Sequence, residues 1–259
     1  MTKFTPGTLD MTACYHFHGD LVTLLRRRWR TTQPIVQPVS RAASIKDVIE
    51  SFGVPHTEVE RIACDGQPTD FSHLVRAGQH FDIHPITAPW DVTRPTPLRP
   101  EPLTGIRFIV DGNVGRLGRY LRMAGFDTLY DPRWDSKTLL GCLGEQPRIV
   151  LTRDLDLLKR KQVVFGRYIR ADKPVGQLRE VLALFGLGRW PRPFARCLDC
   201  NTPLEPVDKQ RIVHRLEPLT RRYFERFTFC PHCDKIYWAG SHVERMKADL
   251  AVPDSMADQ

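Results

Sequence analysis

The chain has 259 residues, 41% of them hydrophobic, and a formal net charge of +8. It contains no run of about 18 uncharged apolar residues, and its first residues lack the basic and apolar stretches of a signal peptide, so we expect neither a membrane span nor secretion. Seven cysteines, an odd number that includes two Cys-x-x-Cys pairs, favour a reducing cytoplasmic compartment and a metal site over a framework of disulfides.

The first segment, residues 12–86, alternates short strands and helices. Its predicted helices are Leu21–Trp29 and a second one that Ser44 caps, which runs to Phe52 and is closed by Gly53. The predicted strands are Ala13–His18, Ile35–Val39, Ile62–Cys64 and Gln79–His84. This pattern is typical of a small α+β domain of the β-grasp type. It presents no group of residues that we expect to be catalytic.

Six prolines crowd into residues 85–102, and such a stretch resists both helix and sheet. We therefore expect residues 87–104 to form a semi-rigid, extended linker. A second break, rich in glycine and proline, spans residues 186–193. The two breaks divide the chain into predicted domains at residues 12–86, 105–190 and 194–250.

The second domain repeats a strand-then-helix pattern four times. The predicted strands are Arg107–Val110, Thr128–Tyr130, Arg148–Thr152 and Tyr168–Arg170. The predicted helices are Val114–Ala124, Ser136–Leu143, Asp154–Lys161 and Val175–Phe185. This alternation predicts an α/β fold in which helices cover both faces of a parallel sheet. In such sheets, function gathers at the carboxyl ends of the strands.

All of the chain's net positive charge lies in this second domain and its edges. Residues 105–195 hold 17 Lys and Arg against 9 Asp and Glu, whereas residues 1–104 balance at 11 against 11 and residues 196–259 at 10 against 10. A basic surface attracts polyanions such as nucleic acids. The candidate phosphate-binding residues are Arg116, Arg119, Arg122, Arg153, Lys159, Arg160 and Lys161. The alternative is that the basic side chains only form a solvated helix face.

Aspartates follow the predicted strands of this domain. Asp111 comes directly after the first strand, Asp131 and Asp135 after the second, and Asp154 and Asp156 after the third. If the first and third strands are neighbours, Asp111 and Asp154 converge at one edge of the sheet. Two carboxylates about 5 Å apart repel each other by roughly 3 kcal/mol at an effective dielectric constant near 20. A proton or a divalent cation must relieve this repulsion, and carboxylate oxygens suit Mg²⁺ or Mn²⁺.

Helix capping is the alternative explanation for the same acids. Asp111 (or Asn113), Asp135 and Asp154 stand where helix N-caps stand, and capping alone favours aspartate there. Their joint occurrence inside a basic segment favours a metal-dependent nuclease, because bound cations stabilise the attacking and leaving oxygens when a phosphodiester is cleaved.

Four cysteines form the second chemical signal of the chain. The pairs Cys197–Cys200 and Cys230–Cys233 have the spacing of a tetrahedral Cys₄ zinc site, with an intervening segment that we expect to form a loop or hairpin arm. Four protein ligands leave no position for a catalytic water, so this zinc is expected to be structural. A redox dithiol is the alternative. The nearby residues Tyr237, Trp238, His242 and Arg245 either stack on unpaired bases or pack this ribbon against the second domain.

These motifs resemble the Mut-seven C-terminal RNase domain family. The residues that carry the resemblance are Phe108–Phe126, Leu151–Asp156, the two Cys-x-x-Cys pairs and Tyr237–His242. The stretch Ser44–Glu58 resembles the ubiquitin-like β-grasp domain often found ahead of that family's nuclease domain. The resemblance implies a PIN-like nuclease fold with a fused zinc ribbon.

The resemblance also implies a metal-dependent ribonuclease. Its acids map to Asp111, Asp135 and Asp154, with Asp156 or Asp131 as an accessory residue. The function predicted from the sequence is therefore Mg²⁺- or Mn²⁺-dependent hydrolysis of RNA. The alternative is a non-catalytic RNA-binding or ribosome-associated adaptor. A protein partner that binds through the β-grasp domain is a further possibility.

Overall fold

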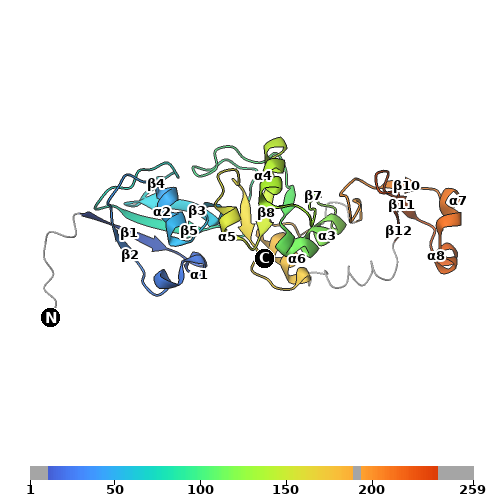
Figure 1. The fold of residues 1–259 in the computed structure, drawn as a ribbon, viewed down its shortest axis with the longest axis horizontal. Helices are drawn as coiled ribbons and strands as arrows, with labels where there is room; N and C mark the ends of the chain where they lie inside the picture. The colour runs from blue at the N-terminus through green and yellow to red at the C-terminus, as the bar shows by residue number, and fades with distance from the viewer. Residues whose placement is uncertain (1–10, 189–193, 239–259) are drawn as a thin grey trace.

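The computed structural model describes residues 11–188 and 194–238, and three sheets follow one another along its long axis (Figure 1). We call the parts built on them the five-stranded unit (residues 11–86), the four-stranded unit (residues 105–188) and the three-stranded unit (residues 194–238). None of the helices in these residues has the length and apolar character needed to cross a membrane.

The five-stranded unit is a mixed sheet with one helix on its inner face. Its strands are β1 (Thr12–Phe17), β2 (Ile35–Pro38), β3 (Val59–Cys64), β4 (Gln67–Thr69) and β5 (His80–Pro85), in the order β2-β1-β5-β3-β4. The central pair β1 and β5 is parallel, and the other pairs are antiparallel. Helix α2 (Ile45–Phe52) contributes Ile45, Ile49 and Phe52 to the core. This arrangement agrees with the α+β architecture that the sequence predicted.

Local signals fix both ends of α2. The Ser44 hydroxyl accepts a hydrogen bond from the Asp47 amide at 3.1 Å, so Ser44 is the N-cap. The helix ends at Gly53, whose φ of 115° lies in the region that favours glycine. Both ends are those that the sequence predicted.

The predicted helix Leu21–Trp29 is wrong in its second half. Helix α1 spans only Leu21–Leu24, Leu25 turns to an extended conformation, and a 3₁₀ turn, η2 (Arg27–Trp29), follows. The Arg26 amide bonds to the carbonyl of Phe52 at 2.8 Å, so a contact with α2 replaces the next helical hydrogen bond. The sequence also missed β4, which is only three residues long and contains a proline.

The four-stranded unit is a parallel sheet with the strand order β7-β6-β8-β9. Its strands are β6 (Phe108–Val110), β7 (Thr128–Leu129), β8 (Ile149–Thr152) and β9 (Gly166–Tyr168). Its helices are α3 (Gly115–Met123), α4 (Ser136–Glu145), α5 (Leu155–Leu158) and α6 (Pro174–Leu184), with a 3₁₀ turn, η4 (Gly112–Val114), before α3. The first and third strands are thus neighbours, as the predicted convergence of Asp111 and Asp154 requires.

Alternate residues of β6 enter two different cores. Phe108 and Val110 pack with residues of α3 and α6, whereas Ile109 packs with residues of α4 and α5. Helices therefore cover both faces of the sheet, as the sequence predicted. The bounds that differ from the prediction by more than one residue are those of three elements: α5 ends at Leu158 rather than near Lys161, α4 ends at Glu145 rather than Leu143, and β9 begins and ends two residues earlier than expected.

The proline-rich segment, which we expected to be a semi-rigid, extended linker, packs against the units on both sides of it. Trp90, Val92 and Leu103 are buried in the core of the four-stranded unit, and Leu98 is buried in that of the five-stranded unit. Buried Arg99 donates hydrogen bonds to the carbonyls of His56, Thr57 and Val59, which belong to the five-stranded unit. Buried apolar residues between the prolines, together with Arg99, thus pack the segment against both units.

The three-stranded unit is small and antiparallel. Its strands are β10 (Glu205–Val207), β11 (Phe227–Phe229) and β12 (Ile236–Trp238). The segment between the cysteine pairs contains β10 and β11, which pair antiparallel as in the predicted hairpin arm. The connection between these two strands is helical: it holds α7 (Lys209–Ile212), the 3₁₀ turn η5 (Val213–Arg215) and α8 (Pro218–Tyr223). The buried core consists of Ile212, Leu216 and Phe227. A core of this size needs additional stabilisation, such as a structural metal.

Candidate active site and metal centre

Asp111 and Asp154 lie at the carboxyl ends of two neighbouring strands, β6 and β8. Thr152, the last residue of β8, is fully buried and links them. Its hydroxyl donates to Asp111 Oδ2 at 2.7 Å and accepts a hydrogen bond from the Asp154 amide at 2.9 Å. The sheet thus brings these two acids to the same edge.

Asn113 ties the two loops of this edge together. Its Nδ2 donates to Asp111 Oδ2 at 2.6 Å, and its Oδ1 accepts a hydrogen bond from the Arg153 amide at 3.0 Å. Neither Asn113 nor Thr152 was singled out as a site residue from the sequence. Both are polar residues within two positions of a strand-end aspartate, and that is the signal that could have identified them.

Two of the predicted catalytic acids, Asp154 and Asp135, also stabilise the start of a helix. Asp154 Oδ1 accepts hydrogen bonds from the amides of Asp156 and Leu157 at 2.8 and 3.2 Å. Asp135 Oδ1 accepts from the amide and the hydroxyl of Thr138, which lowers the pKa of this carboxyl. The helix caps expected under the alternative explanation are therefore present at Asp135 and Asp154. Asp154 is both a helix cap and a neighbour of Asp111 at the edge of the sheet.

The three predicted acids do not form a compact ligand set. In the part of the chain that the structure describes, only two groups have three or more ligand atoms within 4.8 Å of one another, and neither contains Asp111, Asp135 or Asp154. Asp135 follows β7, on the other side of β6 from β8, and is bound to the start of α4. The carboxylate of Asp156 contacts Lys159 Nζ at 3.1 Å. Of the predicted acids, Asp111 and Asp154 thus follow neighbouring strands at one edge of the sheet.

Two further acids lie at the remaining strand ends. Asp131 follows β7, and hydrogen bonds from the side chain and amide of Arg133 lower its pKa to about 2. Asp172 follows β9, and its Oδ1 lies 2.9 Å from Arg153 Nη1, which raises the pKa of Arg153. The sequence analysis did not single out Asp172, although it lies only two residues beyond the predicted fourth strand.

Arg122 is not available for a phosphate contact, so this prediction is wrong. Its side chain is 2% exposed, and the guanidinium donates hydrogen bonds to the carbonyls of Thr128, Tyr130, Leu198 and Asp199 at 2.7 to 3.0 Å. Burial lowers the pKa of Arg122. Leu198 and Asp199 belong to the cysteine loop, so Arg122 holds the three-stranded unit against α3.

The other predicted basic residues remain at the surface to different degrees. Arg116, Arg153 and Arg160 are exposed, and Arg119 is 61% exposed at 3.9 Å from Asp199. Lys159 is half-buried and pairs with Asp156. These residues and the exposed Lys161 are the ones that the structure leaves available for phosphates.

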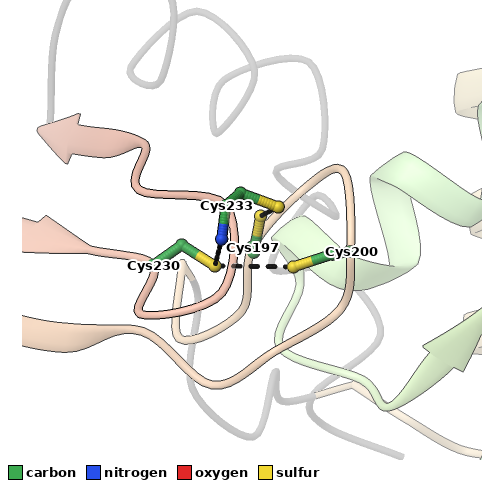
Figure 2. A group of neighbouring side chains, drawn as sticks. All are labelled: Cys197, Cys200, Cys230 and Cys233. Carbon is green, nitrogen blue, oxygen red and sulfur yellow. Dashed lines mark hydrogen bonds between the residues drawn. The ribbon is translucent and has the colours of Figure 1, made fainter.

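The four cysteines form one cluster (Figure 2). Their sulfur atoms all lie within 4.8 Å of one another, with Cys197 and Cys233 at 3.9 Å and Cys200 and Cys230 at 3.4 Å. A tetrahedral zinc ion with Zn–S bonds of about 2.3 Å requires sulfurs about 3.8 Å apart. The donor set therefore fits a Zn²⁺ ion. Both of these sulfur–sulfur contacts join a cysteine of one Cys-x-x-Cys pair to a cysteine of the other pair. A redox dithiol requires only the two cysteines of a single pair.

Tyr237 and Trp238 pack within the three-stranded unit. The Tyr237 hydroxyl lies 3.2 Å from Cys197 Sγ, and the ring of Trp238 lies 6.3 Å from that of Phe227. Trp238 is also partly exposed and lines a groove together with Arg119, Arg215 and Lys235. His242 and Arg245 lie outside the described residues.

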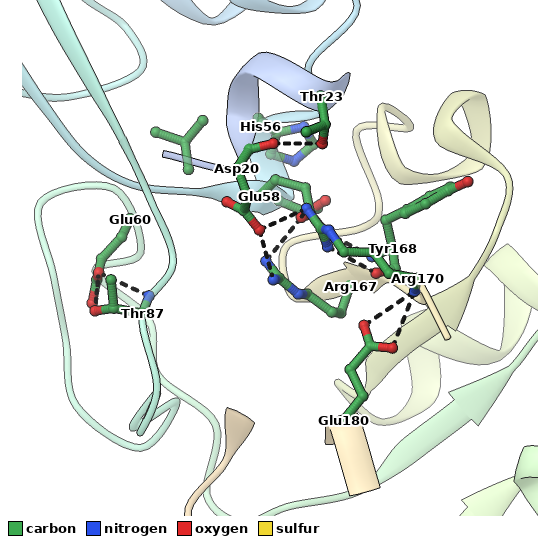
Figure 3. Close-up of polar contacts among 12 residues, drawn as sticks. Asp20, Thr23, His56, Glu58, Glu60, Thr87, Arg167, Tyr168, Arg170 and Glu180 are labelled. Atoms are coloured by element: carbon green, nitrogen blue, oxygen red, sulfur yellow. Dashed lines mark hydrogen bonds and ion pairs between the residues drawn. The ribbon is translucent and has the colours of Figure 1, made fainter. Parts of the chain in front are cut away.

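Arg167 and Arg170 of the four-stranded unit bind a buried acid of the five-stranded unit (Figure 3). Glu58 is fully buried, and its carboxylate accepts hydrogen bonds from Arg167 Nη1 at 2.8 Å, from the Tyr168 amide at 2.7 Å and from Arg170 Nη2 at 3.1 Å. The ring of His56 bonds to the carbonyl of Val163 at 2.8 Å. The charge surplus counted from the sequence therefore overstates the positive charge that is exposed at the surface.

Comparison with known proteins assigns the family. The family model of the Mut7-C RNAse domain matches residues 106–250, and that of the Mut7-C ubiquitin domain matches residues 11–91. No curated protein and no solved structure matches the chain. The first match covers more than half of the chain and includes Asp111, Asp154 and all four clustered cysteines. The chain therefore belongs to the Mut7-C RNAse domain family and carries a ubiquitin-like domain ahead of its RNAse domain.

Proposed function

We propose that this protein is a metal-dependent ribonuclease that hydrolyses RNA phosphodiester bonds at the carboxyl edge of the four-stranded sheet. The observation that carries the proposal is the pair Asp111 and Asp154 on neighbouring strands, linked through the buried hydroxyl of Thr152, within a Mut7-C RNAse domain. We further propose that this unit has a PIN-like fold and that the three-stranded unit is a zinc ribbon.

The acids at this edge suit a hard divalent cation, because they offer only carboxylate oxygens. Asp111 and Asp154 would hold Mg²⁺ or Mn²⁺, and Asp135 and Asp156 are the further acids of the proposed site. Such an ion, when bound, supplies an activated water and neutralises the charge that develops on the phosphate. Asn113 and Thr152 orient Asp111, because both donate hydrogen bonds to its Oδ2. Arg153, Arg116 and Arg160 would contact phosphates of the RNA.

The zinc ion of the cysteine cluster would be structural in this account. Its binding contributes on the order of 10 kcal/mol in small zinc domains, which suits a unit with a three-residue buried core. We also propose a cytoplasmic location, which the odd number of cysteines and their two Cys-x-x-Cys pairs favour. The ubiquitin-like domain is a candidate docking module for a protein partner.

The second candidate function is a non-catalytic RNA-binding adaptor. It is favoured by the observation that Asp135 and Asp154 both act as helix caps and that Asp131 is already paired with Arg133. In that case the protein binds RNA in a salt-dependent way without cleaving it. Chelation of Mg²⁺ then leaves binding unchanged.

Asparagine substitutions separate the two functions, because asparagine caps helices about as well as aspartate but lacks the charge. We expect the parent protein to cleave a labelled single-stranded RNA with Mn²⁺, and Asp111→Asn and Asp154→Asn each to slow cleavage about 100-fold or more. Asp70→Asn is the matched control, since Asp70 forms the same kind of local hydrogen bonds, with Ser72, in the five-stranded unit. Equal cleavage by all four proteins sinks the proposal.

A further inference from the structure

A second cluster of metal-ligating side chains lies on the outer face of the five-stranded sheet. The side chains of Tyr15 and Phe17 on β1, and of Phe81 and Ile83 on β5, enter the core. The alternating residues His16, Asp82 and His84 are consequently on the opposite face, with His18 directly after β1. In the parallel register of these strands, His16 is the direct partner of Asp82.

The contacts in this cluster converge on one carboxylate oxygen. His18 Nε2 lies 2.7 Å and His16 Nδ1 3.6 Å from Asp82 Oδ1. The two imidazole rings are 4.1 Å apart between centroids. Ligand atoms of His16, His18 and Asp82 all lie within 4.8 Å of one another, which makes this the second of the two candidate metal groups in the described residues.

We propose that His16, His18 and Asp82 bind a divalent transition-metal ion such as Zn²⁺. Tetrahedral ligands that are 2.0–2.2 Å from a zinc ion lie about 3.3–3.6 Å apart. The His16–Asp82 separation of 3.6 Å lies at this value, and the His18–Asp82 separation of 2.7 Å has to widen by less than about 1 Å. All three side chains are between 31% and 48% exposed, so an ion reaches them from solvent without any opening of the fold. The site is separate from both the cysteine cluster and the acidic edge.

The donor set selects the class of ion. Two imidazoles and one carboxylate suit Zn²⁺, Ni²⁺ or Cu²⁺, whereas Mg²⁺ prefers oxygen ligands alone. His84 stacks on His18 with centroids 4.2 Å apart and rings 3° from parallel. A ring in that position supports the His18 imidazole from behind rather than pointing at the same ion. Three protein ligands leave positions for water or for a ligand from a partner molecule.

The test counts zinc ions on the full-length chain, purified without a polyhistidine tag. Equilibrium dialysis against Zn²⁺ at pH 7.5 should give two ions per chain for the parent and one for Cys230→Ser. We expect one ion also for the double variant His16→Ala/His18→Ala. In Asp82→Asn the dissociation constant of the second ion should be at least tenfold higher than in the parent. The control is His80→Ala, because His80 lies on β5 with Asp82 but outside the cluster. This variant should keep both ions.

A second measurement on the unaltered chain guards against misfolded variants. In NMR spectra of the histidine rings, addition of Zn²⁺ beyond one equivalent should shift the signals of His16 and His18 together and leave buried His56 unchanged. A parent that binds one ion, a double variant that still binds two, or ring signals that do not move would each overturn the proposal. Loss of the second ion in His80→Ala would overturn the ligand assignment.

Discussion

Replacing Arg122 by methionine should detach the three-stranded unit from α3. Methionine keeps much of the apolar stem but removes the donors to four carbonyls, two of which, in Leu198 and Asp199, belong to the cysteine loop. Hydrogen bonds to a charged group contribute about 1.5–3 kcal/mol each, and the desolvation of the guanidinium offsets part of that sum. We expect the free energy of unfolding to fall by about 3 kcal/mol.

Urea unfolding and hydrogen exchange together measure this effect. The amides of Asn201 and Leu204, which are hydrogen-bonded within the cysteine loop, should exchange faster in Arg122→Met. Arg119→Met is the matched control one turn earlier on α3, because its side chain is 61% exposed and its contact with Asp199 is long. We expect that control to lose less than about 1 kcal/mol of stability.

For RNA binding, in contrast to stability, we expect Arg119→Met to have the larger effect of the two substitutions. Arg119→Met should weaken RNA binding and reduce the salt dependence of affinity by about one phosphate contact, whereas folded Arg122→Met should keep the parent's salt dependence. If Arg122→Met proves as stable as the parent and loses RNA affinity, Arg122 is a phosphate ligand and the structural role assigned to it is refuted.

Three further predictions concern the contacts between units and the cysteine cluster. Glu58→Gln leaves Arg167 and Arg170 without their buried counter-charge, so calorimetry should show a loss of about 3 kcal/mol; an unchanged melting temperature contradicts the role of this contact. The pKa of Asp127 is lowered because hydrogen bonds from Arg148 and Asn201 outweigh the effect of burial, so the stability it contributes is present above its unfolded pKa of about 3.9 and is lost as pH falls through the lower folded value. Urea midpoints measured from pH 6 to pH 2 should therefore fall less steeply in Asp127→Asn, and parallel curves count against this linkage. Removal of zinc by a strong chelator, or Cys200→Ser, should abolish protection of amides in residues 195–238 while those of β6 and β8 stay protected; uniform protection after chelation rules out a structural metal.

Local patterns in the sequence predicted the parts of this fold that depend on nearby residues. The helix between Ser44 and Gly53 followed from its caps, and the parallel sheet with helices on both faces followed from the alternation of strands and helices. That β6 and β8 are neighbours was only a condition of the prediction. The cysteine cluster followed from spacing alone, because two Cys-x-x-Cys turns have few other structural uses.

Contacts between distant residues could not be predicted in this way. Arg122 meets the Leu198 carbonyl across 76 positions, and Arg167 meets Glu58 across 109. The sequence shows a basic residue on a helix or strand but not which unit covers it. Arg167 was therefore counted in the charge surplus without being assigned a role, and Arg122 was mistaken for an RNA contact.

The histidine cluster was missed for a related reason. His16 and Asp82 are 66 positions apart, and they meet only because β1 and β5 pair in parallel in one register. A shift of one residue would place Asp82 on the buried face of the sheet. The alternation within each strand was visible in the sequence, whereas the register between the strands was not.

The most direct test of the central claim is a crystal of the protein soaked in Mn²⁺, examined for anomalous scattering. Our account predicts a peak between the carboxylates of Asp111 and Asp154, at about 2.2 Å from an oxygen of each, and its loss in Asp111→Asn. A crystal soaked in Mn²⁺ at a saturating concentration that shows no peak at the carboxyl ends of β6 and β8 would contradict it.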